Sequence, residues 1–484
     1  MGYLSKYLVQ YLSSAGTDPQ AQLKVVVGTS RASDVTIGRI PTTAKAISDA
    51  LDAIRATGVS NRALRLPGLT PRRLISGVNS VTVQVPASEL EALAASAGVE
   101  FVRPERLHRM HLNTSPTQLG VTSAVRSQFD GTGIRVAVID SGIDANHPDL
   151  RGRVNLANSR NFTQEGSATD VTDLNGHGTH VAGIIGGAGA TFKGVAPKVE
   201  FIACKVFTVD GSAREGAVLA AVQWAIDHNA DVINYSGGFA PVDRNNQPII
   251  PPPWVWPADL VEEEVEFARA MESGIVAVVS AGNEGEIGRR GTLSMPATCP
   301  QVISVGAVDK GNVLARFSSV GPAFRSSRVS PADMVDTLTP ALRPQTNSFD
   351  EIDLLAPGGS VDRVAGSAGG CFFAPGIISA LSADAVGADT VCFVENRYQR
   401  MSGTSQAAPH ITGLSALVLQ AANTLGANLG PRRAFAVKGI LRAACTRLPG
   451  LRRTEQGQGI PIWNDIERIL RDIASGARPV SDFT

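Results

Sequence analysis

The stretch Gly403-Thr404-Ser405-Gln406-Ala407-Ala408-Pro409-His410 is a turn of small residues that leads into an apolar run at residues 411–420. The apolar run predicts a buried helix, and small residues before it would let another backbone come close. Free N–H groups and partial positive charge at a helix N-terminus favour an anion that forms there. A serine hydroxyl is a poor nucleophile until a base removes its proton. By itself the stretch is more simply explained as a Ser/Thr helix cap, so its meaning depends on whether the chain supplies a base.

The composition is that of a globular protein with two domains. The chain has 484 residues, more than one domain usually holds, and 43% of them are hydrophobic. Lys+Arg and Asp+Glu both number 44, and a net charge of zero argues against binding to nucleic acid or to an anionic membrane surface. No stretch reaches the ~18 apolar residues of a membrane span. The five cysteines lack metal-ligand spacing.

The first residues carry no secretory signal pattern, which would be a basic region, an apolar core and a cleavage site of small residues. For the chain as written we therefore expect a cytoplasmic protein, or a secreted one if a signal has been removed.

Residues 1–112 are expected to form a separate N-terminal domain. Residues 3–12 have apolar side chains on one helical face. Strands predicted at 23–27, 73–75, 81–85 and 99–102 and helices at 43–56 and 88–97 follow in the order β-α-β-β-α-β. This order is that of a small α+β, ferredoxin-like sandwich. Residues 103–117 are polar with two prolines and are expected to be a linker.

Residues 113–484 alternate between strand and helix patterns. Strands are predicted at 134–139, 199–206, 231–234, 275–280 and 302–308, and helices at 216–229, 260–273, 432–447 and 463–474. The alternation predicts an α/β fold of three layers with a doubly wound, mostly parallel sheet. Long stretches at 241–259, 323–351 and 360–400 interrupt the pattern and are expected to be insertions, and loops of this length are usually functional or mobile.

Asp140 directly follows the apolar strand at 134–139. Ligands of open parallel sheets bind at the carboxyl ends of the strands, so this carboxylate is a site candidate, although a turn or helix-cap aspartate would look the same. His177 and His180 begin an apolar segment further on. Their i,i+3 spacing lacks the glutamate and the i,i+4 spacing of a zinc-protease helix, so we expect no metal there.

Asp140, His177 and Ser405 occur in the order Asp–His–Ser, which is the order of the subtilisin triad. The α/β-hydrolase and chymotrypsin orders do not fit. The chain resembles the subtilisin-like serine protease family throughout residues 118–470, apart from the three insertions. The segments that carry the resemblance are 136–144, 149–150, 177–183, 194–197, 231–234, 281–285, 317–322, 356–358 and 403–405.

This resemblance implies a serine endopeptidase that needs no cofactor for its chemistry. Ser405 Oγ would attack the peptide carbonyl, His177 would accept its proton and pass it to the leaving amine, and Asp140 would orient the imidazole. Asn283 resembles the oxyanion-hole asparagine of the family, with the Ser405 backbone N–H as the second donor.

The resemblance also implies two substrate-binding segments. The first would run antiparallel to the substrate and bind its backbone, and the second would wall the pocket for the residue before the scissile bond. Small residues there suggest room for a large apolar side chain, and Glu284 at the rim would also admit a basic one. The residues are Ser236, Gly237, Gly238, Ser280, Ala281 and Gly282.

Two departures from the family pattern concern calcium and oxidation. Residues 186–193 stand where the family has its tight calcium loop, and they are too poor in carboxylates and amides for about six to eight oxygen ligands. We therefore expect that site to be absent, so that Asp149 matches the family pattern without the other calcium ligands. A weak calcium site of carbonyl oxygens near residues 296–300 stays open. Gln406 replaces a methionine that is usual in the family, which affects oxidation sensitivity more than mechanism.

Residues 1–112 resemble the inhibitory propeptide of subtilisins, notably in segments 90–94 and 98–104. The resemblance implies a zymogen whose own propeptide acts as an intramolecular inhibitor. Because the catalytic segment is recognisable from about Leu119, we expect self-cleavage in the window Met110, His111, Leu112, Asn113 and Thr114.

Two other functions compete with that of a general protease. One is a catalytically idle subtilase fold that serves as a binding or scaffold protein. The other is a regulatory protease dedicated to one partner, which the missing signal and the insertion at 241–259 favour. In the main interpretation the partners are a protein or peptide substrate and the chain's own propeptide.

Overall fold

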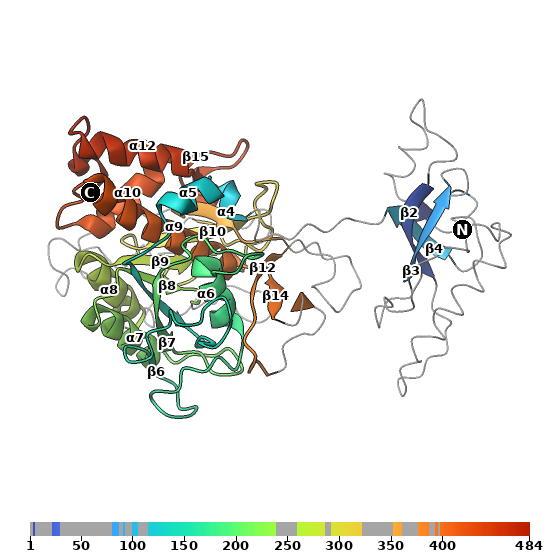
Figure 1. Cartoon of the computed structure of the whole chain (residues 1–484), viewed down its shortest axis with the longest axis horizontal. Coiled ribbons are helices and arrows are strands. Elements are labelled where there is room, and N and C mark those ends of the chain that lie inside the picture. Colours follow the sequence, from blue (N-terminus) through green and yellow to red (C-terminus); the bar gives the residue numbers. More distant parts are fainter. Residues whose placement is uncertain are drawn as a thin grey trace. The chain divides into compact units, whose positions relative to one another are not determined.

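The computed structural model describes residues 3–4, 22–29, 80–86, 91, 99–104, 115–238, 259–285, 292–321, 352–360, 376–386, 393–394 and 397–484. The chain divides into two compact units, Met1–Arg109 and Met110–Thr484 (Figure 1). Each unit is described by itself, and the domain boundary expected after residue 112 stays a prediction.

The N-terminal unit contains one sheet with the strand order β1-β4-β2-β3. β2 (Gln22–Thr29) pairs in antiparallel fashion with β3 (Ser80–Pro86) and β4 (Val99–Pro104), which confirms three predicted strands. The helix predicted for residues 3–12 is wrong at its start. Tyr3–Leu4 forms β1 and pairs in parallel with β4, because an open strand edge offers backbone partners that outweigh a short amphipathic pattern.

The remaining elements predicted for this unit fall outside the described residues, apart from residue 91. They are the helices at 43–56 and 88–97 and the strand at 73–75. The ferredoxin-like order of the unit therefore stays a prediction.

A seven-stranded sheet organises the C-terminal unit, in the order β11-β10-β9-β8-β5-β7-β6. Every neighbouring pair is parallel. The five predicted strands are confirmed to within one residue, and the edge strands β6 and β11 are additional. The strands are β5 (Arg135–Asp140), β6 (Arg160–Asn161), β7 (Glu200–Lys205), β8 (Val232–Tyr235), β9 (Val276–Ser280), β10 (Ile303–Val308) and β11 (Leu354–Pro357).

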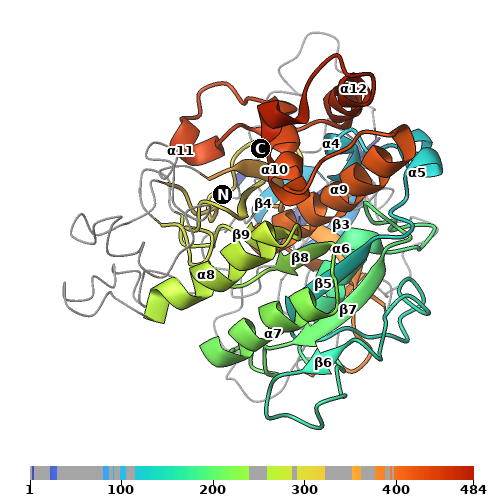
Figure 2. The same ribbon diagram turned by 90° about the vertical axis from the view of Figure 1, so that its left-hand side faces the viewer.

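Helices cover both faces of this sheet, which confirms the predicted α/β fold of three layers (Figure 2). α7 (Glu215–Asp227) and α8 (Asp259–Glu272) pack together on one face. α6 (His177–Gly186) and α9 (Thr404–Leu425) pack together on the other. α7 and α8 share a face because the right-handed crossovers from β7 to β8 and from β8 to β9 run in the same direction across the sheet.

Small helices and a short sheet complete the C-terminal unit. α4 (Ser115–Gln118) and α5 (Ser123–Gln128) precede β5, and α10 (Arg433–Ala443), α11 (Arg453–Gln456), α12 (Trp463–Ala474) and the 3-10 helix η4 (Val480–Phe483) follow α9. The helix predicted for 432–447 ends at Ala443, because β15 (Cys445–Thr446) pairs instead with β16 (Ile460–Pro461). Within the described ranges, no helix has the length and apolarity needed to cross a membrane.

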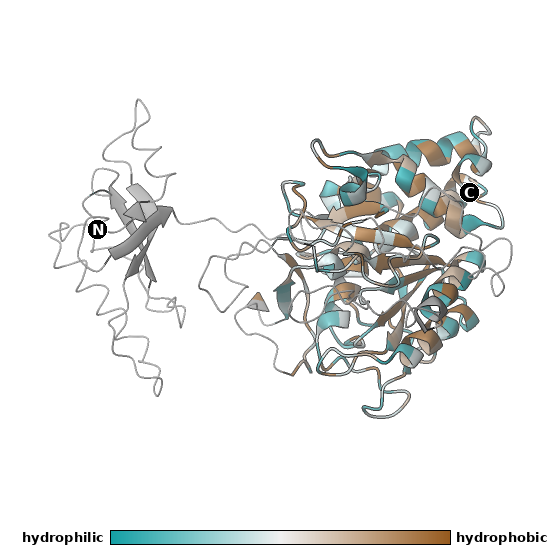
Figure 3. Cartoon of the chain, turned by 180° about the vertical axis from the view of Figure 1, so that it is seen from behind, coloured by the Kyte–Doolittle hydropathy of each residue, from teal (hydrophilic) through white to brown (hydrophobic). Residues whose placement is uncertain are grey.

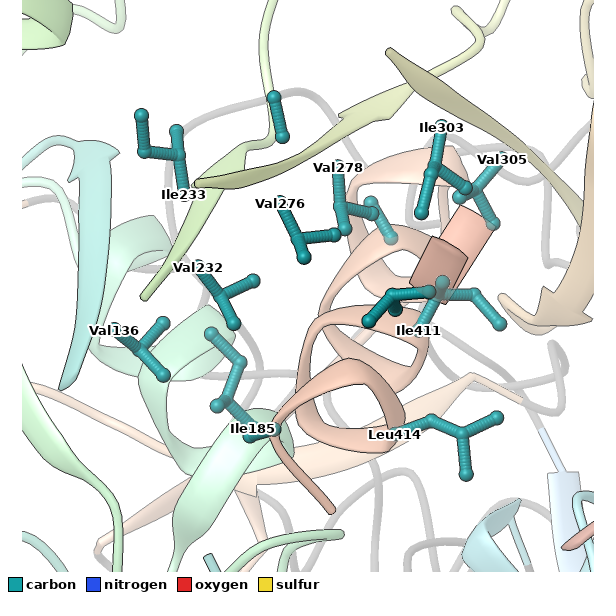
Figure 4. Close-up of a cluster of buried hydrophobic side chains, with 14 of the residues drawn as sticks. Val136, Ile185, Val232, Ile233, Val276, Val278, Ile303, Val305, Ile411 and Leu414 are labelled. Carbon is teal, nitrogen blue, oxygen red and sulfur yellow. The ribbon is translucent and has the colours of Figure 1, made fainter. Parts of the chain in front are cut away.

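The core lies between the sheet and its helices. Hydrophobic residues dominate the central strands (Figure 3), and side chains such as Val232 and Val276 are fully buried. Ile411 and Leu414 of α9 belong to the same buried cluster as valine and isoleucine side chains of β8, β9 and β10 (Figure 4). Burial of each such side chain stabilises the fold by about 1.5–3 kcal/mol. The apolar run at 411–420 is thus the buried helix that its pattern predicted.

Part of the stretch expected as an insertion at 360–400 forms regular structure. β14 (Tyr398–Met401) lies between β12 (Ile377–Ala380) and β13 (Phe393–Val394) in an antiparallel sheet. β12 packs on α6, and the side chain of Ser379 donates a hydrogen bond to the His180 carbonyl (2.7 Å). The insertions expected at 241–259 and 323–351 lie outside the described residues, apart from residue 259.

Candidate active site

Asp140 and His177 come together at the carboxyl end of the central strand β5. Asp140 is the last residue of β5 and is fully buried, and His177 is the first residue of α6, the helix that follows. His177 Nδ1 lies 2.8 Å from Asp140 Oδ1 and donates to it. Since Nδ1 carries the hydrogen, Nε2 of the neutral ring is free to accept a proton.

Asp140 is a carboxylate whose charge is only partly compensated. Oδ1 accepts a second hydrogen bond from the Ser141 backbone N–H (2.8 Å), and the buried Oδ2 has no partner among the described residues. Burial lowers the pKa of His177, but the charge and hydrogen bond of Asp140 and the charge of Asp173 raise it by more, so its pKa lies above the usual value. This environment stabilises the protonated imidazole.

Asp173 holds the start of α6 in place. Its Oδ1 accepts from the Gly176 backbone N–H (2.8 Å) and from the Ser141 hydroxyl (2.8 Å). Its Oδ2 accepts from the backbone N–H and the hydroxyl of Thr179 (2.8 and 2.6 Å). The sequence analysis missed this residue. An aspartate a few residues before a helix start is a helix-capping signal, which could have identified it.

His180 is bound through its ring to the backbone of β12 and β14. Its Nε2 lies 3.1 Å from the carbonyl oxygens of both Ile377 and Gln399 and donates to them. Burial lowers its pKa to about 3. Among the described residues, no three His, Cys, Asp or Glu side chains are grouped so that they could hold a metal ion.

Ser405 is the second residue of α9, at the N-terminus of the buried helix. Its Oγ donates to the carbonyl oxygen of Ser236 (3.1 Å), and the hydroxyl of Ser236 donates to the carbonyl oxygen of Ser405 (3.0 Å). The two residues are therefore joined by a reciprocal pair of hydrogen bonds. The structure thus places Ser405 next to the predicted substrate segment that begins at Ser236.

Asn283 lies next to the same turn and is fixed through its oxygen. Asn283 Oδ1 accepts from the Thr404 backbone N–H (2.9 Å), and it shares the Thr404 hydroxyl hydrogen (3.0 Å) with the Gly282 carbonyl oxygen (3.1 Å). The Thr404 hydroxyl also accepts from the Gly282 N–H (3.1 Å). Asn283 is exposed, and its Nδ2 has no partner in the described part of the chain. This orientation leaves two amide hydrogens available beside Ser405.

The two predicted substrate segments both lie against residues 294–295. A Cβ on Gly238 would come 2.6 Å from the Met295 carbonyl oxygen, and one on Gly282 would come 2.1 Å from Ser294 Oγ. Gly282 has a φ of +106°, so only glycine suits this position. Of the other predicted residues, Gly237 is half-buried, while Ser236, Ser280 and Ala281 are buried.

Glu284 is held by two serines that the sequence analysis missed. Its Oε2 accepts from the hydroxyls of Ser294 (3.2 Å) and Ser319 (3.1 Å). Nothing in the sequence pattern connects these residues, since Ser319 is 35 positions from Glu284. The contacts fix the carboxylate beside Gly282 and Ser294.

The carboxylate of Asp149 has a partner within the chain. Asp149 Oδ2 accepts from the hydroxyl of Tyr398 on β14 (3.0 Å), and a Cβ on Gly189 would come 2.4 Å from the same oxygen. Tyr398 is packed against the rings of Phe192 and His147. A neutral donor and the neighbouring backbone therefore take up the space around this carboxylate, and the residues present do not fit a tight calcium site.

The carbonyl oxygens near residues 296–300 also have a partner. Lys438 of α10 is buried, and its Nζ donates to Pro300 O (2.8 Å), Val302 O (2.5 Å) and Asp353 Oδ2 (3.0 Å). An ammonium group has three hydrogens, so these acceptors saturate it. This fixed positive charge would repel a metal cation, so the Pro300 carbonyl does not fit a calcium site.

The predicted processing window, residues 110–114, lies outside the described residues. Ser115, which follows it, is buried at the start of α4. Its hydroxyl lies 2.8 Å from His410 Nε2 and donates to it, since His410 Nδ1 donates to the Gln406 carbonyl (2.8 Å). From Ser115 onward, the chain is thus joined to α9.

Comparison with known proteins identifies the family of the chain. Residues 131–459 match the subtilase family. The chain is 29% identical over 350 residues to subtilisin NAT of Bacillus subtilis subsp. natto, which is 71% of each chain. It is 32% identical over 302 residues to the subtilisin of Bacillus pumilus, covering 61% of this chain and 80% of that one. It is 31% identical over 305 residues to an intracellular serine protease of Paenibacillus polymyxa, covering 62% and 71%.

Proposed function

The chain belongs to the subtilase family and is a serine endopeptidase, and from this we propose that Asp140, His177 and Ser405 are its catalytic triad. The contact of 2.8 Å between Asp140 and His177 at the end of β5 carries the proposal. It leaves Nε2 as a base on the ring, while the helix N-terminus at Ser405 favours negative charge.

In the proposed reaction, Ser405 Oγ first turns away from the Ser236 carbonyl. His177 Nε2 takes the hydroxyl proton as Oγ attacks the peptide carbonyl carbon. The imidazolium then gives this proton to the leaving amine as the C–N bond breaks, which leaves an acyl-enzyme. Water, deprotonated by the same imidazole, releases the acyl group. Side chains and water are sufficient for these steps, so no cofactor is needed.

The negative oxygen of the tetrahedral intermediate is proposed to bind Asn283 Nδ2 and the Ser405 backbone N–H. The Thr404 contacts support this role, because they hold Asn283 Oδ1 and so turn Nδ2 toward open space beside Ser405. A donor fixed before the reaction stabilises developing charge without reorganisation.

The substrate is proposed to lie along residues 236–238 and 280–282. Main-chain pairing to the first segment would align the peptide, and Glu284 would favour a basic side chain in the pocket beside Ser294. A protein or peptide is the proposed substrate class. A stabilising calcium ion is not part of the proposal, because Tyr398 and Lys438 take up the candidate oxygens.

We also propose that the chain is a zymogen that cuts itself between residues 110 and 114. The hydrogen bond between Ser115 and His410 joins α4 to α9. A cut after Ser115 would separate these two residues, so the contact supports a cut before Ser115. The intact mass of purified wild type, next to that of Ser405→Ala, tests this. Loss of about residues 1–112 in the wild type only is expected, and an uncut wild type that still hydrolyses peptides would contradict it.

The proposed function is tested by hydrolysis of a quenched fluorescent peptide library. We expect the wild type to cleave it and Ser405→Ala, Asp140→Asn and His177→Ala to lose nearly all activity. Ser415→Ala is a matched control, because Ser415 is a buried serine on the same helix whose hydroxyl, within the described ranges, bonds only the Ile411 carbonyl (2.8 Å). An inactive wild type, with or without residues 1–112, would instead support an idle binding protein.

A further inference from the structure

The carbonyl oxygen of Ser405 has no partner within its own helix. In an α-helix the carbonyl of residue i accepts from the N–H of residue i+4. Residue 409 is a proline inside α9, and proline has no N–H. A buried carbonyl without a donor is costly, and here the Ser236 hydroxyl supplies the donor at 3.0 Å.

Two further buried side chains set the direction of the Ser236 hydroxyl. Asn234 Nδ2 donates to Ser236 Oγ (2.9 Å), and Asn234 Oδ1 accepts from Thr412 Oγ1 (2.8 Å). An amide has one donor end and one acceptor end, and in this arrangement the Thr412 hydroxyl donates to the Oδ1 end while the Nδ2 end faces Ser236. With Nδ2 on Ser236 Oγ, the Ser236 hydrogen is directed at the Ser405 carbonyl.

We propose that Thr412, Asn234 and Ser236 are positioning residues for the nucleophile, an inference that rests on the proposed role of Ser405. They connect the end of β8 to the first turn of α9. Asn234 and Thr412 are fully buried, so no water can replace a lost partner. Catalytic groups must be held to within tenths of an ångström, and a loose first turn of α9 would misplace Ser405 Oγ.

Without the Thr412 hydroxyl, the Asn234 amide is free to turn over. Its Oδ1 would then face Ser236 and accept the hydrogen that now goes to the Ser405 carbonyl. Thr412→Val makes this change, since valine keeps the shape of threonine and removes the hydroxyl. The consequence is a lower rate of acylation, although no residue that is proposed to contact substrate has been substituted.

Ser415→Ala is the matched control. Both side chains are buried on α9, and both hydroxyls bond back to a carbonyl four residues earlier, Thr412 to Ala408 (3.2 Å) and Ser415 to Ile411 (2.8 Å). Only Thr412 also reaches Asn234. Comparison of the two variants therefore separates the loss of a helical back-bond from the loss of positioning.

The test measures kcat and KM on one peptide substrate, and the rate at which a fluorophosphonate labels Ser405. Thr412→Val should lower kcat and the labelling rate by about tenfold and leave KM within about twofold, the size expected for a small misplacement of a reacting group. Ser415→Ala should match the wild type, and Thr412→Ser should restore most of the loss.

Equal rates in Thr412→Val and Ser415→Ala would overturn the inference, and so would a Thr412→Ser variant as slow as Thr412→Val. A wild type without Ser405-dependent hydrolysis would remove the proposed function together with this inference. An active wild type with an unaffected Thr412→Val would remove only the positioning role.

Discussion

Ser405 Oγ lies 3.1 Å from the carbonyl oxygen of Ser236 and donates its hydrogen bond there. Among the described residues this is the one hydrogen bond that the hydroxyl donates. The hydroxyl hydrogen is therefore directed at a backbone carbonyl, and in the proposed mechanism a rotation about the Cα–Cβ bond brings it to His177 before attack. In that mechanism the Ser236 carbonyl and the imidazole compete for the same hydrogen.

The pH dependence of kcat/KM should report the raised pKa of His177. Activity needs the neutral imidazole, so it should fall on the acid side with an apparent pKa at or above ~6.5, the ordinary histidine value. Asp140→Asn removes the charge that raises this pKa and also the tautomer control, so kcat should drop by about 10⁴. Rates measured from pH 5 to 9 check both points, and an acid limb well below the ordinary value would contradict the first.

Replacement of Asn283 should lower turnover and leave binding nearly unchanged. Asn283→Ala removes the Nδ2 donor, and loss of such a donor typically costs on the order of 10²–10³ in kcat. Thr404→Val should cause part of this loss because it removes one of the two groups that fix Asn283 Oδ1, and Thr404→Ser should not. Steady-state kinetics give kcat and KM for each variant. A rise in KM at constant kcat would point to ground-state binding.

Lys438 should stabilise the C-terminal unit in place of a cation. In a Ser405→Ala background, which prevents self-digestion, Lys438→Met should lower the free energy of unfolding by about 3 kcal/mol, because it takes the ammonium donor from the carbonyls of Pro300 and Val302 and removes an ion pair with Asp353. Lys198→Met is the control, since Lys198 is largely exposed and its ion pair with Asp130 is worth no more than ~1 kcal/mol. Denaturant titrations measure both.

The Ser405→Ala protein also tests whether calcium stabilises the fold. Removal of calcium with EDTA, or its addition, should leave the unfolding midpoint of the Ser405→Ala protein unchanged. A midpoint that rises with calcium would show that Tyr398 and Lys438 do not replace a bound ion.

His410 should make stability depend on pH. Burial lowers its pKa to about 4, so the folded state keeps this ring neutral while the unfolded chain protonates it near pH 6.5. The contribution of neutral His410 to the free energy of unfolding is complete above pH 6.5. It is lost as the pH falls toward 4, with a slope of about 1.4 kcal/mol per pH unit. Stability curves of Ser405→Ala with and without His410→Gln should differ by this slope. Parallel curves would contradict it.

Most strands of the C-terminal unit could be predicted from the sequence, because the patterns that indicate them are local. A continuous apolar strand predicts a central position in a parallel sheet, and the five such strands lie within a residue of their predicted bounds. Asp140 and His177 were predictable because each stands at the boundary of an element.

Residues that act through long-range contacts could not be predicted in the same way. Tyr398 lies 249 positions from Asp149 and Thr412 lies 178 from Asn234, so neither pair leaves a periodic pattern. At Tyr3–Leu4, by contrast, a local pattern was present and gave a wrong prediction. A clear helical pattern is overruled there by strand pairing with β4, which only the fold makes available.

A labelling experiment shows whether Ser405 is a nucleophile that His177 activates. The wild-type protein is treated with a fluorophosphonate, and the label is located by mass spectrometry of its peptides. We expect one label per molecule, on Ser405, with little labelling of His177→Ala and none of Ser405→Ala at that site. A wild type that stays unlabelled, or that reacts as slowly as His177→Ala, would contradict it.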